Sequence, residues 1–260
     1  TLFPYTTLFR LIVKQWRFPE ASERELARNI QRAVAKLVEL MRRKTHAMKF
    51  DATDAEITDA EQEAQDYAKE LVAALIGLLP ALAVTVYKFN TKQWINVAKS
   101  AGGAKNQSVM LLIAIGATQS EPWYQESRDQ WESMSAAAIN KLFTNIIDDW
   151  AGNVRNANFT NKTTAQVNEL ADKRFAVYNS WASNRATGIV GSWNSRLMRQ
   201  RLADARVTHY FWHGMLDDRE RLQHLQWEGK RIALNAIHDF PGEPYGCRCW
   251  AVPDFEKQGD

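Results

Sequence analysis

The residues best suited to metal chemistry are concentrated in one short part of this 260-residue chain. The chain has five histidines and two cysteines, and six of these seven residues lie between His209 and Cys249. Thiolate sulfur and imidazole nitrogen are the usual protein ligands of tetrahedral Zn²⁺, which can fasten a module too small to be held by its own core. The clustering makes a structural zinc site one of two interpretations of this segment.

The spacing of the cysteines and the position of a predicted helix indicate which residues can bind one metal ion. Cys247 and Cys249 can both reach one metal ion, whereas a disulfide across a single intervening residue would be strained. We expect His224, on a predicted short helix, to join these two thiols, with His238 as the fourth ligand. The alternative is that the thiols are small buried groups and that His224 is a packed, hydrogen-bonded side chain.

A catalytic alternative pairs Asp218 with His224 as acid and base. With a metal-activated water, this pair would make the chain a metal-dependent hydrolase. The sequence contains no glycine-rich phosphate loop, no nucleophile elbow and no His-Glu-x-x-His helix. We therefore predict no enzymatic activity and no small-molecule substrate.

The elements that must position these residues form a small α+β module over residues 207–260. Alternating residues at its start are typical of a strand, and Pro and Gly residues mark its turns. We expect a strand over 207–213 and a short helix over 218–226, followed by a turn at Gly229. A loop over 241–246 and a closing strand over 247–252 should complete the module.

The chain before this module is predicted to be helical, with an N-terminal region over 11–119 and a stem over 120–206. Apolar residues recur at helical intervals along both segments. The expected fold class is therefore mainly α, with long amphipathic helices followed by a short strand and loop domain. Capping-box spacing predicts helix starts at Ser22 and Thr58, and Gly152 should end a helix of the stem.

Charge does not by itself indicate a nucleic-acid partner, because 33 Lys+Arg against 30 Asp+Glu leave a formal net charge of only +3. The charges are unevenly placed: residues 10–49 carry eleven basic and four acidic side chains, and residues 51–70 carry one basic and eight acidic. This pattern indicates an antiparallel helix pair that neutralises itself. The alternative is a DNA-binding packaging or ejection accessory that uses the basic residues of 10–49 and 196–231.

No membrane partner is expected. The longest uncharged apolar run, Leu71 to Val86, is interrupted by Pro80 and is shorter than the ~20 residues that cross a bilayer. The start of the chain does not have the pattern of a secretory signal, so we expect an intracellular, soluble protein.

The first ten residues, TLFPYTTLFR, resemble the translated sequence of a sequencing adapter. The alternative is a short native strand. We favour the adapter, set residues 1–10 aside from functional interpretation, and expect the native N-terminus to lie further upstream.

The C-terminal residues together resemble a known family. The runs THYFWHGMLDDRERLQHLQWEGKRI and PGEPYGCRCWAVPDF carry, in order, a strand ending in an aromatic residue, an Asp-x-Arg-x-x-x-x-His-like segment, a glycine turn, a Pro-Gly loop and Cys-Arg-Cys. This combination is similar to the C-terminal signature of phage Mu F-like minor head proteins, the phage head morphogenesis family. The resemblance covers roughly residues 165–255. The matching positions are Trp212, Asp218, Arg219, Arg221, His224, Gly229, Pro241, Gly242, Cys247, Arg248 and Cys249.

The resemblance implies a minor capsid protein of a tailed phage or prophage, without catalytic activity. Proteins of this family associate with the portal and with capsid or scaffold proteins of the procapsid, and they help head assembly and the packaging or delivery of phage DNA. The same resemblance implies that the protein is located in the phage head, which is assembled in the cytoplasm of the bacterial host.

Overall fold

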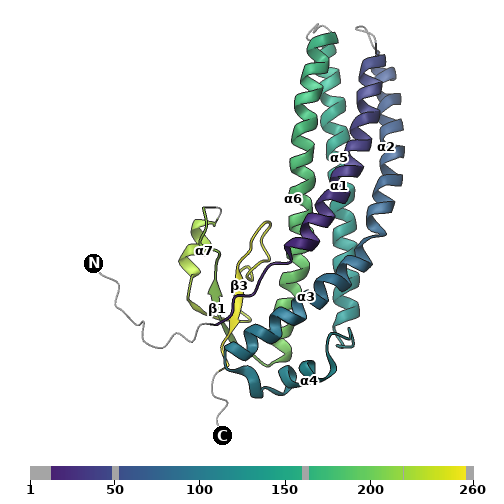
Figure 1. Cartoon of the computed structure of the whole chain (residues 1–260). Coiled ribbons are helices and arrows are strands. Elements are labelled where there is room, and N and C mark those ends of the chain that lie inside the picture. Colours follow the sequence, from purple (N-terminus) through teal and green to yellow (C-terminus); the bar gives the residue numbers. More distant parts are fainter. Residues whose placement is uncertain (1–12, 49–52, 160–163, 219, 256–260) are drawn as a thin grey trace, which may run out of the picture. The chain divides into compact units, whose positions relative to one another are not determined.

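The computed structural model describes residues 13–48, 53–159, 164–218 and 220–255 (Figure 1). The protein is 71% helical and has a small three-stranded antiparallel sheet near its C-terminal end. The predicted fold class, mainly α with a small α+β module, is therefore confirmed. Residues 1–10, which resemble adapter sequence, lie outside the described residues.

The described residues form long helices first and strands only after the last long helix. In chain order the elements are α1 (Glu20–Ala47), α2 (Asp54–Ile76), α3 (Leu79–Ser100), the 3₁₀ helix η1 (Gly103–Lys105), α4 (Gln107–Ile115), α5 (Tyr124–Phe159), α6 (Thr164–Asp204), β1 (His209–His213), α7 (Leu222–Trp227), β2 (Arg231–Ala233) and β3 (Trp250–Pro253). The chain divides into two compact units, each built from separate stretches of sequence. Unit 1 includes residues 13–19, 83–128 and 190–255, and unit 2 includes the described residues within 20–82 and 129–189.

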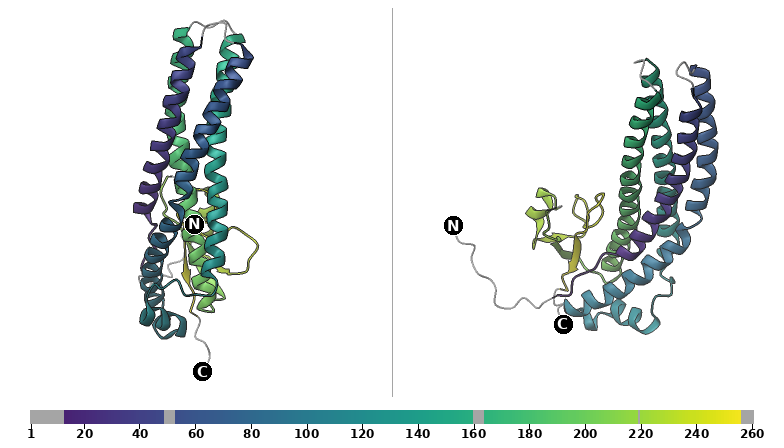
Figure 2. Two further views of the ribbon diagram at one scale, coloured as in Figure 1. Left: turned by 90° about the vertical axis from the view of Figure 1, so that its right-hand side faces the viewer. Right: turned by 45° about the horizontal axis from the view of Figure 1, so that its top comes forward.

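Unit 2 contains four helices that lie side by side, α1, α2, α5 and α6, as all three views show (Figures 1 and 2). Apolar residues of α1, from Leu26 to Met41, are buried at helical intervals. The basic helix α1 packs against the acidic helix α2, and Lys44 forms an ion pair with Glu63 between them. The predicted pairing of a basic with an acidic helix is thus confirmed.

Two helices begin earlier in the structure than the sequence predicts. Helix α1 begins at Glu20, and Ser22 is buried within its first turn. Helix α2 is capped by Thr53 rather than Thr58: the Thr53 hydroxyl accepts from the backbone N–H of Glu56, whose carboxylate accepts from the Thr53 N–H at 2.7 Å. Both threonines have a glutamate three residues later, so the spacing alone cannot distinguish the two caps.

A break separates α2 from α3 close to Pro80. Helix α2 ends at Ile76, and Pro80 lies in the first turn of α3, where a backbone N–H would have no helical partner. By length and composition alone, the stretch Asp54–Ser100 is apolar enough to cross a membrane, with a mean hydropathy of 2.0 over 18 residues. Helices in the core of a protein can be equally long and apolar, so this property alone does not indicate a membrane span.

The predicted end of the stem helix at Gly152 is wrong, because α5 continues through Gly152 to Phe159. Outside its own helix, no described atom lies within 4 Å of the position that a Cβ on Gly152 would take. Glycine in a helix interior loses more chain entropy on folding than alanine does. We therefore expect Gly152→Ala to raise the free energy of unfolding by about 0.5–1 kcal/mol, measured by urea unfolding.

A second glycine provides the contrast for this substitution. A Cβ on Gly103 would lie only 2.3 Å from the ring of Phe255, so Gly103→Ala should lower the free energy of unfolding by about 1–3 kcal/mol. A Gly152→Ala variant that is destabilised like Gly103→Ala would contradict the continuous helix.

Unit 1 contains the sheet, in which β1 is central between β2 and β3. Tyr210 and Trp212 of β1 are buried and their neighbours are half-buried, which is the predicted alternation. After α7 the chain turns at Gly229, whose φ of 70° favours glycine and whose N–H donates to the Trp212 carbonyl at 2.8 Å. The closing strand begins at Trp250, later than predicted. Strand β2 is missing from the predicted elements because its three residues are too few to show alternation.

Candidate metal centre

Three buried side chains that favour metal binding come together in unit 1. They are His224 of α7 and the thiols of Cys247 and Cys249, which precede β3. His224 Nδ1 lies 3.6 Å from Cys247 Sγ and 3.4 Å from Cys249 Sγ, and all three ligand atoms lie within 4.8 Å of one another. In a tetrahedral zinc site, bonds of about 2.3 Å to sulfur and 2.0–2.1 Å to nitrogen place these two atoms about 3.6 Å apart. The cluster can therefore hold a metal ion.

Aromatic rings and a local turn hold these ligands in place. The His224 ring stacks on Trp227 with centroids 5.7 Å apart and meets Trp212 edge-on at 5.2 Å. The backbone N–H of Cys249 donates to Cys247 Sγ at 3.4 Å, so the chain folds back over the first thiol. Trp212, one of the residues of the family resemblance, thus packs directly against a predicted ligand.

The protonation states of the cluster suit a cation. A hydrogen bond from Cys249 lowers the pKa of the Cys247 thiol to about 7, although burial acts in the opposite direction. The same hydrogen bond, together with burial and the nearby Glu220 carboxylate, raises the pKa of Cys249. Burial lowers the pKa of His224, so its imidazole is neutral at pH 7. A bound cation would favour the thiolate form of both cysteines.

A carboxylate lies next to the three ligands. Cys249 Sγ donates to Glu220 Oε1 at 3.0 Å, so this carboxylate contacts one of the three ligands. His238, predicted as the fourth ligand, is not brought into the cluster. Its Nδ1 lies 2.6 Å from the carbonyl oxygen of Asp239, and its ring packs 5.1 Å from that of Trp227. Its Nε2 is buried and has no hydrogen-bond partner among the described residues.

Two arginines of the family resemblance tie the flanking loops together. Arg248, between the cysteines, forms an ion pair with Asp217. Arg221 Nη2 donates to the carbonyl oxygen of Tyr245 at 2.5 Å. Both contacts join the segment before α7 to the segment that carries the thiols. Arg219 lies outside the described residues.

The predicted Pro-Gly loop contacts the end of α6 within unit 1. Ser195 Oγ donates to the Pro241 carbonyl at 2.9 Å. Gly242 has a φ of 80°, and a Cβ there would lie 3.4 Å from both Ser195 Cβ and the Cys249 carbonyl oxygen. Glycine suits this position because it adopts the left-handed region without strain and allows the close approach.

The structure does not assemble the alternative acid/base pair. Asp218 is exposed, and in the part of the chain that the structure describes its carboxylate makes no contact with His224. His224 Nδ1 faces the two sulfur atoms instead.

No family model, curated protein or solved structure matches the chain.

Proposed function

We propose that this chain is a minor capsid protein of a tailed phage or prophage, of the head morphogenesis type. Its partners are then the portal and the capsid or scaffold proteins, and it is located in the phage head assembled in the host cytoplasm. The observation that supports this proposal is the convergence of the family-like residues. Trp212, Arg221, His224, Cys247, Arg248 and Cys249 all lie in or directly beside one buried cluster of unit 1.

We further propose that zinc is the metal held by His224, Cys247 and Cys249. Thiolate and imidazole ligands favour zinc over magnesium or calcium, which prefer oxygen. Bound zinc would supply structural stability, because it would fasten α7 to the segment before β3. In this function the module is a rigid recognition element and carries out no reaction.

A DNA-binding role is less well supported by the contacts of α1. Lys44 is paired with Glu63, and Arg42 Nη2 lies 2.9 Å from Asp172 Oδ1. These pairs reduce the positive charge that α1 can offer to phosphates. Steeply salt-dependent binding to duplex DNA would be the sign that the alternative is correct.

Co-expression with a portal protein encoded near this gene tests the proposed function. We expect the full chain to co-elute with the portal in size-exclusion chromatography. The Cys247→Ser variant should elute separately because its recognition module is no longer fastened. The matched variant His46→Ala, which changes an exposed histidine of α1, should co-elute like the wild type. Separate elution of the wild-type chain and an intact portal ring would contradict the proposal.

A further inference from the structure

A pocket of about 260 Å³ opens beside α4 in unit 1. None of its lining residues belongs to the metal centre. The lining combines apolar side chains with charged ones, chiefly Trp94, Leu111, Ile115, Glu121, Arg201 and Asp204.

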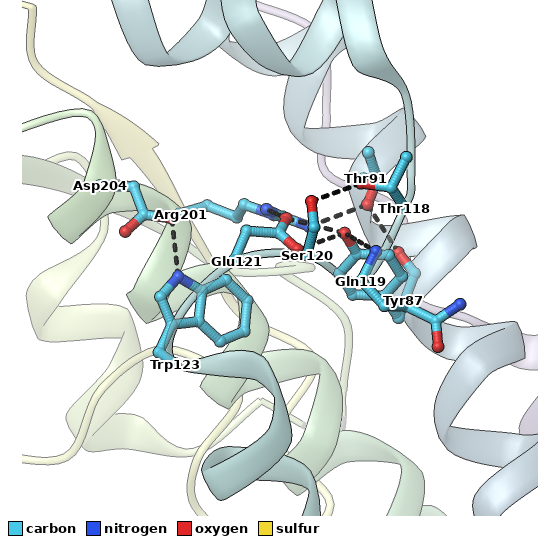
Figure 3. A network of polar contacts seen from close by, with 9 residues as sticks. All are labelled: Tyr87, Thr91, Thr118, Gln119, Ser120, Glu121, Trp123, Arg201 and Asp204. Carbon is cyan, nitrogen blue, oxygen red and sulfur yellow. Dashed lines mark hydrogen bonds and ion pairs between the residues drawn. The ribbon is translucent and has the colours of Figure 1, made fainter.

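Arg201 lines this pocket and is only 2% exposed, and it lies within a network of polar contacts (Figure 3). It forms an ion pair with the Glu121 carboxylate, and its Nη2 donates to Thr91 Oγ1 at 2.9 Å. The Tyr87 hydroxyl donates to the same carboxylate at 2.7 Å, and the guanidinium lies 5.0 Å from the Tyr87 ring centroid. The charge of Arg201 is therefore balanced by Glu121, and both groups are held rigidly.

Asp204 adds a second carboxylate near Arg201, which is already paired with Glu121. Its Oδ2 accepts a 2.8 Å hydrogen bond from Trp123 Nε1 (Figure 3), and the residue is exposed. Among the described residues, no basic side chain forms an ion pair with this carboxylate. Because Glu121 and Arg201 cancel, the charged groups of the pocket carry one excess negative charge.

The helix beside the pocket presents apolar side chains to solvent. Leu111 and Ile115 line the pocket and are 58% and 48% exposed, and Met110 and Ile113 of the same helix are exposed as well. Exposed apolar patches mark sites of protein interaction, and Leu111 and Ile115, four residues apart, lie on one face of the helix. The surface of α4 and the pocket together thus combine an apolar patch with a carboxylate.

We propose that this surface binds a basic, amphipathic segment of a partner protein. A Lys or Arg of that segment pairs with Asp204, and its apolar side chains pack on Leu111 and Ile115. Charge complementarity favours a basic partner, because the pocket is negative although the chain as a whole carries a formal net charge of +3. The inference does not depend on the proposed phage function.

The size of the pocket favours a side chain over a free small molecule. Sites for small-molecule ligands have volumes of about 300–1,000 Å³, and this pocket is smaller. A long basic side chain has an aliphatic stem that can lie along Trp94 and Leu111 while its charged end reaches Asp204.

Fluorescence anisotropy with a labelled amphipathic Leu/Lys peptide and the full chain tests the proposal. We expect the wild type to bind this peptide and to bind a matched Leu/Glu peptide much more weakly. Asp204→Asn keeps the acceptor for Trp123 but removes the charge, and it should weaken Leu/Lys binding on the order of tenfold. Leu111→Asp should weaken binding to a similar extent because it places a charge within the apolar contact.

Matched variants elsewhere in the chain serve as controls. Asp59→Asn removes an exposed carboxylate of α2, and Met134→Asp changes a 64% exposed side chain of α5. Both should alter the peptide affinity by less than about twofold. Circular dichroism of all four variants checks that each is folded.

Three outcomes would overturn the proposal. One is equal binding of the Leu/Glu peptide. Another is undiminished Leu/Lys binding in both Asp204→Asn and Leu111→Asp. The third is self-association that Leu111→Asp abolishes, without peptide binding, because the occupant would then be a second copy of the chain.

Discussion

Replacing Cys247 with serine should lower the affinity of the protein for Zn²⁺ by at least about 100-fold. Changes in the residues that merely support metal ligands already cost 10–100-fold, and this substitution removes a ligand. Cys247 is the thiol whose pKa is lowered to about 7, so it is the thiolate most available to a metal at neutral pH. The measurement is a competition titration against a chromophoric chelator, supported by elemental analysis of the purified protein.

Histidine variants separate the ligands from their neighbours. His224→Ala should weaken zinc binding as strongly as Cys247→Ser, and His46→Ala should leave it unchanged. His238→Ala and Glu220→Gln distinguish the predicted fourth ligand from the carboxylate that the structure places beside Cys249. Purified wild-type protein that contains less than about 0.2 equivalents of zinc, and takes up none when zinc is added, would contradict the zinc centre.

Replacing the buried Arg201 with methionine should lower the free energy of unfolding by about 1–3 kcal/mol, because it leaves the half-buried Glu121 carboxylate without its charged partner. Arg24→Met provides the matched control on an exposed pair with Glu20, whose side chains are 65% and 61% exposed. That substitution should cost less than about 0.5 kcal/mol. Urea unfolding of both variants gives the comparison.

The dependence on pH gives a second measure of the Arg201 pair. Burial alone would raise the pKa of Glu121, but hydrogen bonds from Tyr87 and Arg201 outweigh it and lower that pKa. The pair therefore contributes stability above the unfolded pKa of glutamate, about 4.3, and this contribution is lost as the pH falls through the lower folded pKa. Arg201→Met should show a smaller loss, because only the hydrogen bond from Tyr87 then remains to lower this pKa.

A double variant tests whether the Arg201 effect is that of an unpaired charge. Combining Arg201→Met with Glu121→Leu should recover part of the lost stability, since replacing both partners removes the uncompensated group. If the double variant is as unstable as the sum of the two single variants, the ion pair is not the source of the effect.

The metal ligands could be predicted from the sequence because their residue types are rare outside the module. His46 is the one histidine or cysteine that lies before residue 207. Glu220 could not be singled out, because the chain has 30 acidic residues and only the folded loop places this one beside Cys249. The cluster could therefore be predicted because its residue types are rare in this chain, whereas only the tertiary structure identifies the neighbouring carboxylate.

The Arg201–Glu121 pair left no local signal in the sequence. The two residues are 80 positions apart, and an arginine in an amphipathic helix is ordinarily expected to face solvent. Gly152 is ambiguous for a different reason. Glycine ends many helices but is also tolerated inside one, and the packing of α5 on both sides of Gly152 favours continuation.

The spacing of the metal ligands along the chain also affects the unfolded state. An ion bound to His224 and the two thiols would link positions 23 and 25 residues apart. Closing a loop of this length as a cross-link removes denatured-state entropy worth about 3 kcal/mol. Strand β2 lies inside that loop and is an edge strand of three residues. A chelator would thus act on this module as a reductant acts on a disulfide-bonded domain, and the amide hydrogens of β2 would be the first of the sheet to exchange.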